Sequence, residues 1–355
     1  MENLSKLSEI FSNLFHTFVI AEAGSNWKVG DKEDDLKMAK KLIEIAAKAG
    51  ADAVKFQTYK PQTVYVANAG KIDYLSTSSK KNINDIFNDL SMPYEMLPEL
   101  QDFCQKNNII FMSTPFSVED AKQVDKFVDI HKIASYEINH IRLLEFVSKT
   151  GKPVLLSTGA CTYTEIDFAV ELLKKNTTKI GLFQCTSKYP TPLDSLNLAV
   201  IPHMKKKYGV PIGLSDHSID PIIGPLVAIG MGATFIEKHF TLDRNLPGPD
   251  HAFALTPSEL NQMVKAIRKA DSAKGNGNKI ILPEEKELYK FATRTIQAIK
   301  DIRKGEILQE GFNIEVLRPG NKKRGLEARF LFDVLNKKAK KAIKIGDGIT
   351  YDDYE

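Results

Sequence analysis

Eight short apolar runs, each ending at a residue that can bind an anion or a metal, most constrain what this chain can fold into. They begin at Phe18, Ala53, Ile110, Ile130, Pro153, Ile180, Pro211 and Thr234. Because the apolar residues are continuous rather than alternating with polar ones, the runs predict parallel strands buried on both faces. Segments of helical periodicity separate them, so strand and helix alternate from Phe18 to about Asp271.

This alternation fits either a closed barrel or an open, doubly wound sheet. An open sheet gathers its polar residues at one crevice, whereas nearly every strand end in this chain carries one. We therefore expect an α/β fold built on a (β/α)8 TIM barrel, with its chemistry at the carboxyl ends of the strands.

Helix ends are readable at two places. The segment from Asp35 to Ala51 has an apolar face and reaches Gly50, a residue suited to a left-handed C-cap. Thr256, followed by Pro257 and then Glu259, is typical of a helix N-terminus.

Two regions interrupt the repeat and suggest the domain organisation. The stretch from Lys60 to about Pro93 is long for a connection and predicts a lid, a binding loop or a disordered segment. A stretch rich in small and polar residues, 273–286, predicts a linker. We expect a barrel over 1–272 and a small, mostly β domain over 287–355, where short β-like runs are joined by glycine turns.

Composition excludes several classes of protein. With 355 residues, 43% of them hydrophobic, the chain can bury a large core. No apolar stretch reaches the roughly 18 residues that span a membrane, and the acidic residues of segment 1–17 argue against a secretory signal. A net charge of +4 is too small to indicate nucleic acid as a partner.

Cysteine usage indicates the compartment. Cys104, Cys161 and Cys185 lack the CxxC spacing of zinc sites and redox motifs. Three cysteines in a chain of this size also argue against a disulfide framework. We expect a protein of the reducing cytoplasm.

Two lysines are the strongest functional signal. Lys55 and Lys132 lie inside buried strands, where an ammonium group is costly unless it meets an anion. A single serine at a strand end can be a packing residue or a cap, but several hydroxyls beside two lysines predict a cradle for phosphate and carboxylate. The candidate hydroxyl residues are Ser113, Thr114, Ser135, Ser157 and Ser215.

Two histidines predict a metal site. His217 and His239 end the seventh and eighth strands, and neighbouring strands lie roughly 4.8 Å apart. Neutral imidazoles suit Mn, Fe, Co, Ni or Zn. Because two ligands do not make a tight site, we expect water, substrate or the Glu22 carboxylate to complete it, as for an exchangeable catalytic ion.

Acidic residues lie at four of these ends: Glu22, Glu137, Glu237 and Asp250. Each can be a general base, a metal ligand or the counter-ion of a buried lysine. Local sequence leaves Glu237 open among these roles. Asp250 can reach a substrate hydroxyl or be a turn residue.

The chain resembles the sialic acid synthases, which make N-acetylneuraminate and related nonulosonic acids. The resemblance runs through AEAGSN, VKFQTYK, FMSTPF, KIASYE, LSTGA, QCTSKYP, GLSDHS, EKHFTLD and GPDHAFAL. In the tail, RTIQAIKDIRKGE and VLRPGN resemble the antifreeze-like SAF domain that follows the barrel in this family.

The resemblance implies a reaction and a site. The family condenses phosphoenolpyruvate with an N-acylated mannosamine-type sugar, aided by Mn or Mg. By position, the resemblance implies that His217 and His239 hold the metal and that Glu22, Glu137 and Asp250 are catalytic. Phosphoenolpyruvate and sugar would be bound by Lys55, Thr114, Lys132, Ser135, Ser157, Ser187, Tyr189 and Ser215. Arg318 would enter from the partner's SAF domain in a domain-swapped homodimer.

The sequence constrains the identity of the sugar less than it constrains the type of reaction. Many members read NHNG after the first strand, but this chain has Trp27 in place of the histidine near the sugar. KIASYE is more similar to the pseudaminic branch, and GPDHAF to the neuraminic and legionaminic branches. We expect an N-acetylneuraminate synthase; the alternative is a legionaminic or pseudaminic acid synthase using a diacetamido-trideoxyhexose. Two other classes remain open, a Schiff-base aldolase using Lys55 or Lys132 and a non-catalytic sugar-binding protein.

Overall fold

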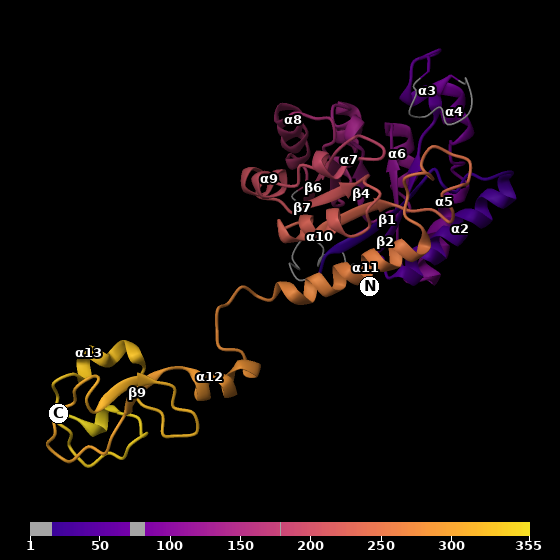
Figure 1. Ribbon diagram of the computed structural model, residues 1–355. Coiled ribbons are helices and arrows are strands. Elements are labelled where there is room, and N and C mark those ends of the chain that lie inside the picture. Colours follow the sequence, from indigo (N-terminus) through magenta and orange to yellow (C-terminus); the bar gives the residue numbers. More distant parts are fainter. Residues whose placement is uncertain (1–15, 72–81, 178) are drawn as a thin grey trace. The chain divides into compact units, whose positions relative to one another are not determined.

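The computed structural model describes residues 16–71, 82–177 and 179–355, in two compact units that divide at Gly275 and Asn276 (Figure 1). Most of segment 1–17, and residues 72–81 of the insertion after the second strand, lie outside the described residues. The two units are described separately below.

Eight parallel strands form the sheet of the first unit, and all eight apolar runs are among them. In the sheet the strands follow the order β3-β2-β1-β8-β7-β6-β5-β4. Because β3 and β4, the two ends of this order, also lie against each other, the sheet is a nearly closed barrel and the predicted (β/α)8 fold is confirmed. The strands are β1 (Phe18–Gly24), β2 (Ala53–Thr58), β3 (Ile110–Pro115), β4 (His131–Ile133), β5 (Val154–Ser157), β6 (Ile180–Cys185), β7 (Ile212–Asp216) and β8 (Phe235–His239).

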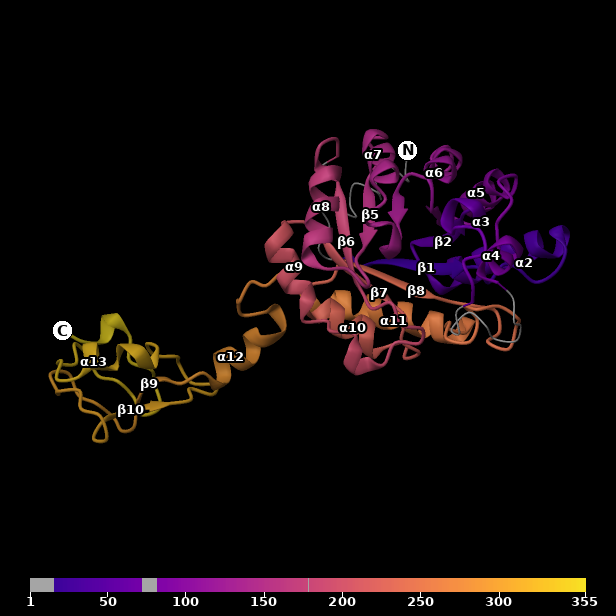
Figure 2. The ribbon, with the colours of Figure 1, turned by 90° about the horizontal axis from the view of Figure 1, so that it is seen from above.

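Helices lie on the outside of these strands (Figure 2). They are α2 (Lys32–Ala49), α5 (Met96–Lys106), α6 (Val118–Val124), α7 (Ile141–Lys149), α8 (Tyr163–Lys174), α9 (Val200–Tyr208), α10 (Ile223–Gly230) and α11 (Pro257–Lys274). Both predicted helix ends are present. Gly50 caps α2 with φ of 84° and donates to carbonyls of the last turn. Thr256 and Glu259 form a reciprocal capping box at the start of α11.

The side chains on the two faces of the sheet belong to two separate hydrophobic clusters. Outward side chains pack with the helices into the main core. Inward side chains at the amino ends of the strands form a separate apolar plug. It consists of Phe18, Ile20, Ala53, Ile110, Met112, Ile130, Leu155, Phe183 and Phe235. Since inward positions recur every second residue, the next inward side chains beyond this plug are the polar ones.

The first strand is tied to the last helix of the barrel. Thr17 donates to Asp271 through its backbone N–H at 2.9 Å and through its hydroxyl at 2.6 Å. Arg268 binds Asp52 at 2.7 Å. These contacts fix β1 between β2 and β8, with which it pairs in parallel.

The long insertion after β2 contains two short helices, α3 (Pro61–Val64) and α4 (Ile83–Asp89). Its base is anchored through Ser91, whose hydroxyl donates to the Tyr59 carbonyl at 2.8 Å. Lys60 donates to the Ser91 hydroxyl at 3.1 Å and lies 4.5 Å from the centre of the Tyr94 ring. The described part of the insertion is therefore bound to the barrel at both ends.

The second unit is small and mostly irregular or β in structure. Strands β9 (Thr295–Ala298) and β10 (Ile314–Leu317) form an antiparallel pair. Helices α12 (Lys286–Ala292) and α13 (Leu331–Val334) accompany them. Its own core includes Ile296, Ile314 and Val334. The described residues of the two units also include short 3-10 turns at Ser135–Glu137, Leu193–Ser195, Pro283–Glu285, Ala328–Phe330 and Tyr351–Asp353.

Two expectations from composition can be compared with the structure. Cys104, Cys161 and Cys185 are free thiols. Within the described ranges, every helix is too short or too polar to cross a membrane.

Candidate active site

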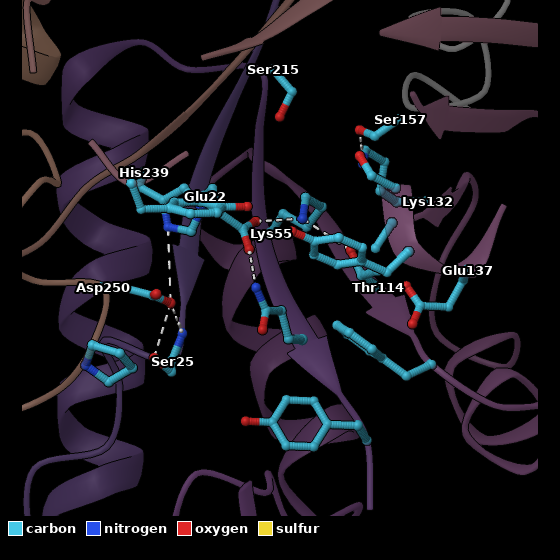
Figure 3. Close-up of a pocket in the computed structure, with 18 of the residues that line it drawn as sticks. Glu22, Ser25, Lys55, Thr114, Lys132, Glu137, Ser157, Ser215, His239 and Asp250 are labelled. Carbon is cyan, nitrogen blue, oxygen red and sulfur yellow. Dashed lines mark hydrogen bonds and ion pairs between the residues drawn. The ribbon is translucent and has the colours of Figure 1, made fainter. Parts of the chain in front are cut away.

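A cavity of about 540 Å³ opens at the carboxyl ends of the strands, and each of the eight strands contributes to its lining. Figure 3 shows Lys132, Ser157 and Glu137 on one side, His239, Asp250 and Ser25 on the other, and Glu22 and Lys55 between them. The barrel therefore gathers residues that are more than 200 positions apart in the chain, such as Glu22 and Asp250, as the eight strand ends predict.

Lys55 lies at the centre of a buried polar network. Its Nζ is 2.6 Å from Glu22 Oε2 and donates to Thr114 Oγ1 at 2.9 Å. Gln57 donates to the other Glu22 oxygen at 3.2 Å. Lys55 is only 3% exposed, so this ammonium group depends on its carboxylate and hydroxyl partners for solvation.

Lys132 is held in a similar way on β4, which is separated from β2 by β3. Its Nζ donates to Ser157 Oγ at 2.6 Å and lies 5.3 Å from the centre of the Phe183 ring. Glu237 lies between the two lysines, 3.7 Å from Lys132 and 3.8 Å from Lys55. Ser215 donates to Glu237 at 3.1 Å. Among the roles open to Glu237, this geometry favours the shared counter-ion.

Burial and charge set the pKa values of this network. Burial raises the pKa of Glu22 to about 7 against the opposing effect of Lys55. Burial would also raise the pKa of Glu237, but Lys132 and Lys55 outweigh it and hold that pKa low. The pKa of Lys132 is lowered by burial, whereas Glu22 and Glu237 overcome burial and raise that of Lys55. Lys55 is therefore the firmly charged ammonium of the pair.

Hydroxyls around Gly159 extend the lysine side of the cavity. The Gly159 N–H donates to Ser135 Oγ at 2.9 Å. Ser187 Oγ is buried and has no hydrogen-bond partner in the described part of the chain. A Cβ on Gly159 would meet the side chains of Ser187, Cys185 and Ser135, so the absence of a side chain here leaves room for three polar groups at once.

His217 and His239 lie together on the other side, with ring centres 5.5 Å apart. His217 Nδ1 is 3.0 Å from the Thr186 carbonyl. Because a carbonyl only accepts, this nitrogen carries the hydrogen and Nε2 keeps its lone pair free. His239 Nδ1 is buried 4.0 Å from Asp250 Oδ2, and no described residue forms a hydrogen bond with it.

These donors fit a divalent cation. Burial, His217 and Lys55 hold the pKa of His239 well below its usual range, so its imidazole is neutral. The pKa of His217 is raised, since Cys185 and the Thr186 carbonyl outweigh burial. No group of three or more His, Cys, Asp or Glu side chains in the described part of the chain is arranged to hold a metal. His217 and His239 stay the predicted metal ligands, close together in the cavity.

The remaining predicted acids are buried at the edge of the cavity. Ser25 donates to Asp250 through its hydroxyl at 3.0 Å, and burial raises the pKa of Asp250. Glu137 lies in the turn after β4, and burial raises its pKa to about 7. Among the described residues Glu137 Oε2 has no hydrogen-bond partner, and Glu137 is part of the cavity lining.

The cavity brings together most of the residues singled out from the sequence. Its lining includes Glu22, Lys55, Thr114, Lys132, Ser135, Glu137, Ser157, Tyr189, Ser215, His217, His239 and Asp250. Ser187 is not part of that lining but its hydroxyl lies beside Gly159. Arg318 belongs to the second unit, where it is exposed.

Two expectations need correction. Ser113 is not part of the cradle: its hydroxyl bonds Thr58 at 2.7 Å and the side chain is fully buried, because Thr114 takes the inward position of β3. Trp27 does not line the main cavity. It is 2% exposed and borders a second cavity of about 590 Å³ with Lys28 and Pro247.

Sequence reasoning missed an aromatic group that lines the main cavity. It consists of Tyr59, Tyr65, Phe87 and Phe116. The available signal was the unusual length of the insertion, because two of these residues, Tyr65 and Phe87, come from it.

Comparison with known proteins gives matches over both units. The NeuB family matches residues 42–279, and the SAF domain matches residues 293–355. The chain is 38% identical to the N,N'-diacetyllegionaminic acid synthase of Campylobacter jejuni, over 92% of this chain and 97% of that protein. It is 36% identical to the pseudaminic acid synthase of the same species, over 95% and 96%. The structure of N-acetylneuraminic acid synthetase from Leptospira borgpetersenii serovar Hardjo-bovis is 34% identical with a TM-score of 0.69, covering 78% of this chain and 91% of that one.

Proposed function

The chain belongs to the NeuB family of nonulosonic acid synthases and carries an SAF domain, and on that premise we propose that it condenses phosphoenolpyruvate with an N-acylated amino sugar, releasing phosphate. One observation carries this proposal. Two buried lysines with hydroxyl partners face two imidazoles across a single cavity. Such a site can hold a highly charged anion beside a carbonyl group that is to be polarised.

The lysine side suits phosphoenolpyruvate. Lys55 and Lys132 would pair with its phosphate and carboxylate, while Thr114, Ser135, Ser157, Ser187 and Ser215 supply hydroxyl donors. The Ser187 hydroxyl, buried without a partner, would gain one. Glu237 keeps the two lysines from repelling each other before the substrate binds.

The imidazole side suits the sugar aldehyde. A divalent cation such as Mn or Mg, held by His217 and His239, would supply Lewis-acid polarisation of the aldehyde. Asp250, fixed by Ser25, would accept a sugar hydroxyl, and the Tyr189 ring, 4.1 Å from that of His217, would form the adjoining surface. Glu22 lies between the two sides and would position water or a proton near the reacting carbons.

The bonds balance as follows. C3 of phosphoenolpyruvate attacks the aldehyde carbon, and the aldehyde oxygen takes a proton. The hydroxyl of water adds to C2, which then carries both this hydroxyl and the phosphate. The C2 hydroxyl then loses its proton, which the departing phosphate can take up, while the C–O bond between C2 and the phosphate breaks. This releases inorganic phosphate and leaves a nine-carbon 2-keto acid.

The identity of the amino sugar is the remaining part of the proposed reaction. N-acetylmannosamine and a diacetamido-trideoxyhexose are both candidates from the sequence. The relatives named for legionaminic and pseudaminic acid support the second candidate at least as well as the first. Both sugars present the same aldehyde to the imidazole side.

We also propose a domain-swapped homodimer in which Arg318 of one chain reaches the cavity of the other. An exposed arginine can bind a substrate hydroxyl or carboxylate through several parallel hydrogen bonds. The three cysteines are free thiols, which supports a location in the reducing cytoplasm.

A Schiff-base aldolase is the second candidate, because burial lowers the pKa of Lys132 and so favours the nucleophilic amine. Borohydride trapping with a carbonyl substrate separates the two candidates. A covalent adduct at Lys132 would establish the aldolase.

The decisive experiment measures phosphate released from phosphoenolpyruvate with a panel of N-acylated amino sugars, with and without Mn. We expect release that requires both a sugar and the cation, and a product heavier than the sugar by three carbons. Absence of release with every sugar would refute the synthase.

A further inference from the structure

We propose that His251 is a positioning residue for the sugar: through a closed ring of hydrogen bonds it holds the Asp250 carboxylate in place at the edge of the cavity. The inference rests on the sugar-binding role proposed above for Asp250. It goes beyond that role because His251 is 1% exposed and is not part of the cavity lining, so it acts on the sugar only through other residues.

The hydrogen-bond ring joins three pairs of consecutive residues. One pair follows β1, one follows β8, and one lies in the loop between β8 and α11: Ser25 with Asn26, Phe240 with Thr241, and Asp250 with His251. Each pair bonds to both of the others. The three segments, which are up to 200 or more positions apart in the chain, therefore hold one another in a closed circle.

The bond between Ser25 and Asp250 sets the position of the carboxylate. Ser25 Oγ donates to Asp250 Oδ2 at 3.0 Å, and both side chains line the cavity (Figure 3). The same carboxylate oxygen lies 4.0 Å from His239 Nδ1 and would lie 2.8 Å from a Cβ on Gly24. The carboxylate is thus confined between the ends of β1 and β8, where a small displacement changes its distance to a bound sugar.

The other two bonds are buried outside the cavity lining. Asn26 Nδ2 donates to the Phe240 carbonyl at 2.8 Å, which ties the segment after β1 to the end of β8. Thr241 Oγ1 lies 2.7 Å from His251 Nδ1, which ties the end of β8 to the loop that carries the carboxylate. Asn26, Thr241 and His251 are each at most 1% exposed, so bulk water does not compete for these bonds.

Stability alone does not require a histidine at position 251. Thr241 Oγ1 has two other partners, because it donates to the Asp243 carbonyl at 3.1 Å and accepts from the Asp243 N–H at 3.2 Å. His251 Nε2 is buried and forms no hydrogen bond with any described residue, which costs free energy. An apolar side chain would avoid this cost and leave Thr241 satisfied. The position of Asp250 is therefore what the imidazole contributes.

The loop has a second anchor that does not involve the ring. Arg244 Nε donates to the Ala254 carbonyl at 2.8 Å, and Nη2 of the same side chain donates to Glu259 at 2.8 Å. These contacts join the two ends of the loop across Asp250. Loss of the bond between Thr241 and His251 should therefore displace the carboxylate without unfolding the loop.

The test measures KM for both substrates in the phosphate-release assay with the full-length protein. The sugar is the better substrate of two, N-acetylmannosamine and a 2,4-diacetamido-2,4,6-trideoxyhexose. We expect His251→Leu to raise KM for the sugar about 10-fold or more, since a small misplacement in an active site can cost about 100-fold. KM for phosphoenolpyruvate and the melting temperature should change little. Equal rises in both KM values, or an unchanged KM for the sugar, would overturn the proposal.

Two further variants separate positioning from packing. His251→Asn keeps a polar group near the position of Nδ1 and should restore most of the sugar affinity. Thr241→Val removes the same bond from the other side and should raise KM for the sugar in the same selective way. A KM for the sugar in His251→Asn that is as high as in His251→Leu would contradict the role of the hydrogen bond.

Hydrogen exchange tests the ring without any substrate. In His251→Leu the backbone amides of 241–255 should exchange faster, and so should the Ser25 amide, which donates to Asp250 Oδ2 at 3.3 Å. Unchanged exchange at both places would refute the ring, whatever the activity. Absence of phosphate release from the wild-type protein with either sugar would instead refute the proposed function, and the exchange measurement would still decide whether the ring exists.

A matched control loses a hydrogen bond elsewhere. Tyr208 on α9 donates to Asp167 on α8 at 2.8 Å, and neither residue lines the cavity. Tyr208→Phe should leave both KM values and the exchange of 241–255 as in the wild type. A response equal to that of His251→Leu would show that the effect is not specific to the ring.

Discussion

Lys238 and Asp216 form a buried ion pair, Nζ to Oδ2 at 2.6 Å, and each directly precedes one of the two candidate metal ligands. Lys238 also donates to the Ser218 carbonyl at 2.6 Å, and Asp216 accepts from the Ser218 N–H at 2.8 Å. His217 is thus fixed through the residues on both sides of it. The pair links the ends of β7 and β8 and sets the spacing of the two imidazoles.

Replacing one member of this ion pair should strongly reduce the stability of the protein. Lys238→Met leaves the Asp216 carboxylate buried without its cation, which should lower the free energy of unfolding by about 3–5 kcal/mol. Denaturant unfolding measures this loss, and calorimetric titration with Mn should show weaker binding as well. The double variant Asp216→Asn with Lys238→Met should regain stability but not Mn affinity. Lys37→Met, at an exposed ion pair of α2, should change little.

Glu137 should make stability depend on pH. Its pKa is about 7 in the folded protein and 4.5 ordinarily, so the folded state holds its proton more tightly. The free energy of unfolding should therefore fall as pH rises from about 4.5 to 7 and then level off, a change on the order of 3 kcal/mol. Denaturant unfolding of Glu137→Gln over this range should show a decline that is smaller by this amount, because Glu22, whose pKa is also about 7, still contributes its own share. Parallel curves for the two proteins would disprove the assignment.

A methyl group at Gly159 should disturb the phosphoenolpyruvate side selectively. The added Cβ would lie 2.9 Å from Cys185 Sγ and 3.0 Å from Ser135 Oγ, and would collide with the Ser187 side chain. We expect Gly159→Ala to raise KM for phosphoenolpyruvate about 10-fold or more, with a smaller change in KM for the sugar, as measured by steady-state kinetics. Gly230→Ala meets no atom within 4 Å and serves as control. Equal effects of Gly159→Ala and Gly230→Ala on KM for phosphoenolpyruvate would contradict a steric conflict between the added methyl group and the side chains around Gly159.

Removal of divalent metal should stop the reaction without unfolding the barrel. Treatment with a chelator should abolish phosphate release, and added Mn should restore it. His239→Ala should lower kcat by at least about 100-fold, comparable to losing one strong electrophilic contact. The exposed His203 offers a control substitution with normal kinetics. Full activity in the chelator would contradict the metal role of both imidazoles.

Arg318 can be tested by mixing two variants that are impaired in different ways. Arg318→Ala should weaken sugar use, and Lys132→Ala should abolish phosphoenolpyruvate binding. If Arg318 acts on the partner's barrel, a mixed dimer contains one site with both groups intact, so refolding the two together should restore part of the activity. No recovery, or wild-type kinetics in Arg318→Ala alone, would exclude the swapped arrangement.

The positions of the strands and the functional importance of the two lysines were predictable, because buried strands require continuous runs of apolar residues. A lysine inside an apolar run, such as Lys55, has few explanations other than a buried anion. Thr114 and Ser113 show a further rule that could have been applied: adjacent strand residues face opposite sides, so only one of them can reach the cavity.

Other features depend on distance in space rather than on local pattern. Glu237 pairs with Lys55 and Lys132, which are more than 100 positions away, so its role as counter-ion follows only from the barrel. The role of Phe87 also depends on contacts that the local sequence does not reveal. An aromatic residue in a long insertion has no defined partner until the insertion is seen to pack on Tyr59.

The place of β1 in the barrel has a consequence for biosynthesis. Phe18–Gly24 pairs on one side with a strand made soon afterwards, but its other neighbour, Phe235–His239, is made more than 200 residues later. During translation, one edge of β1 stays unpaired until almost the whole barrel has left the ribosome. An unpaired edge invites association with other chains, so the nascent chain is expected to need a chaperone for most of its synthesis.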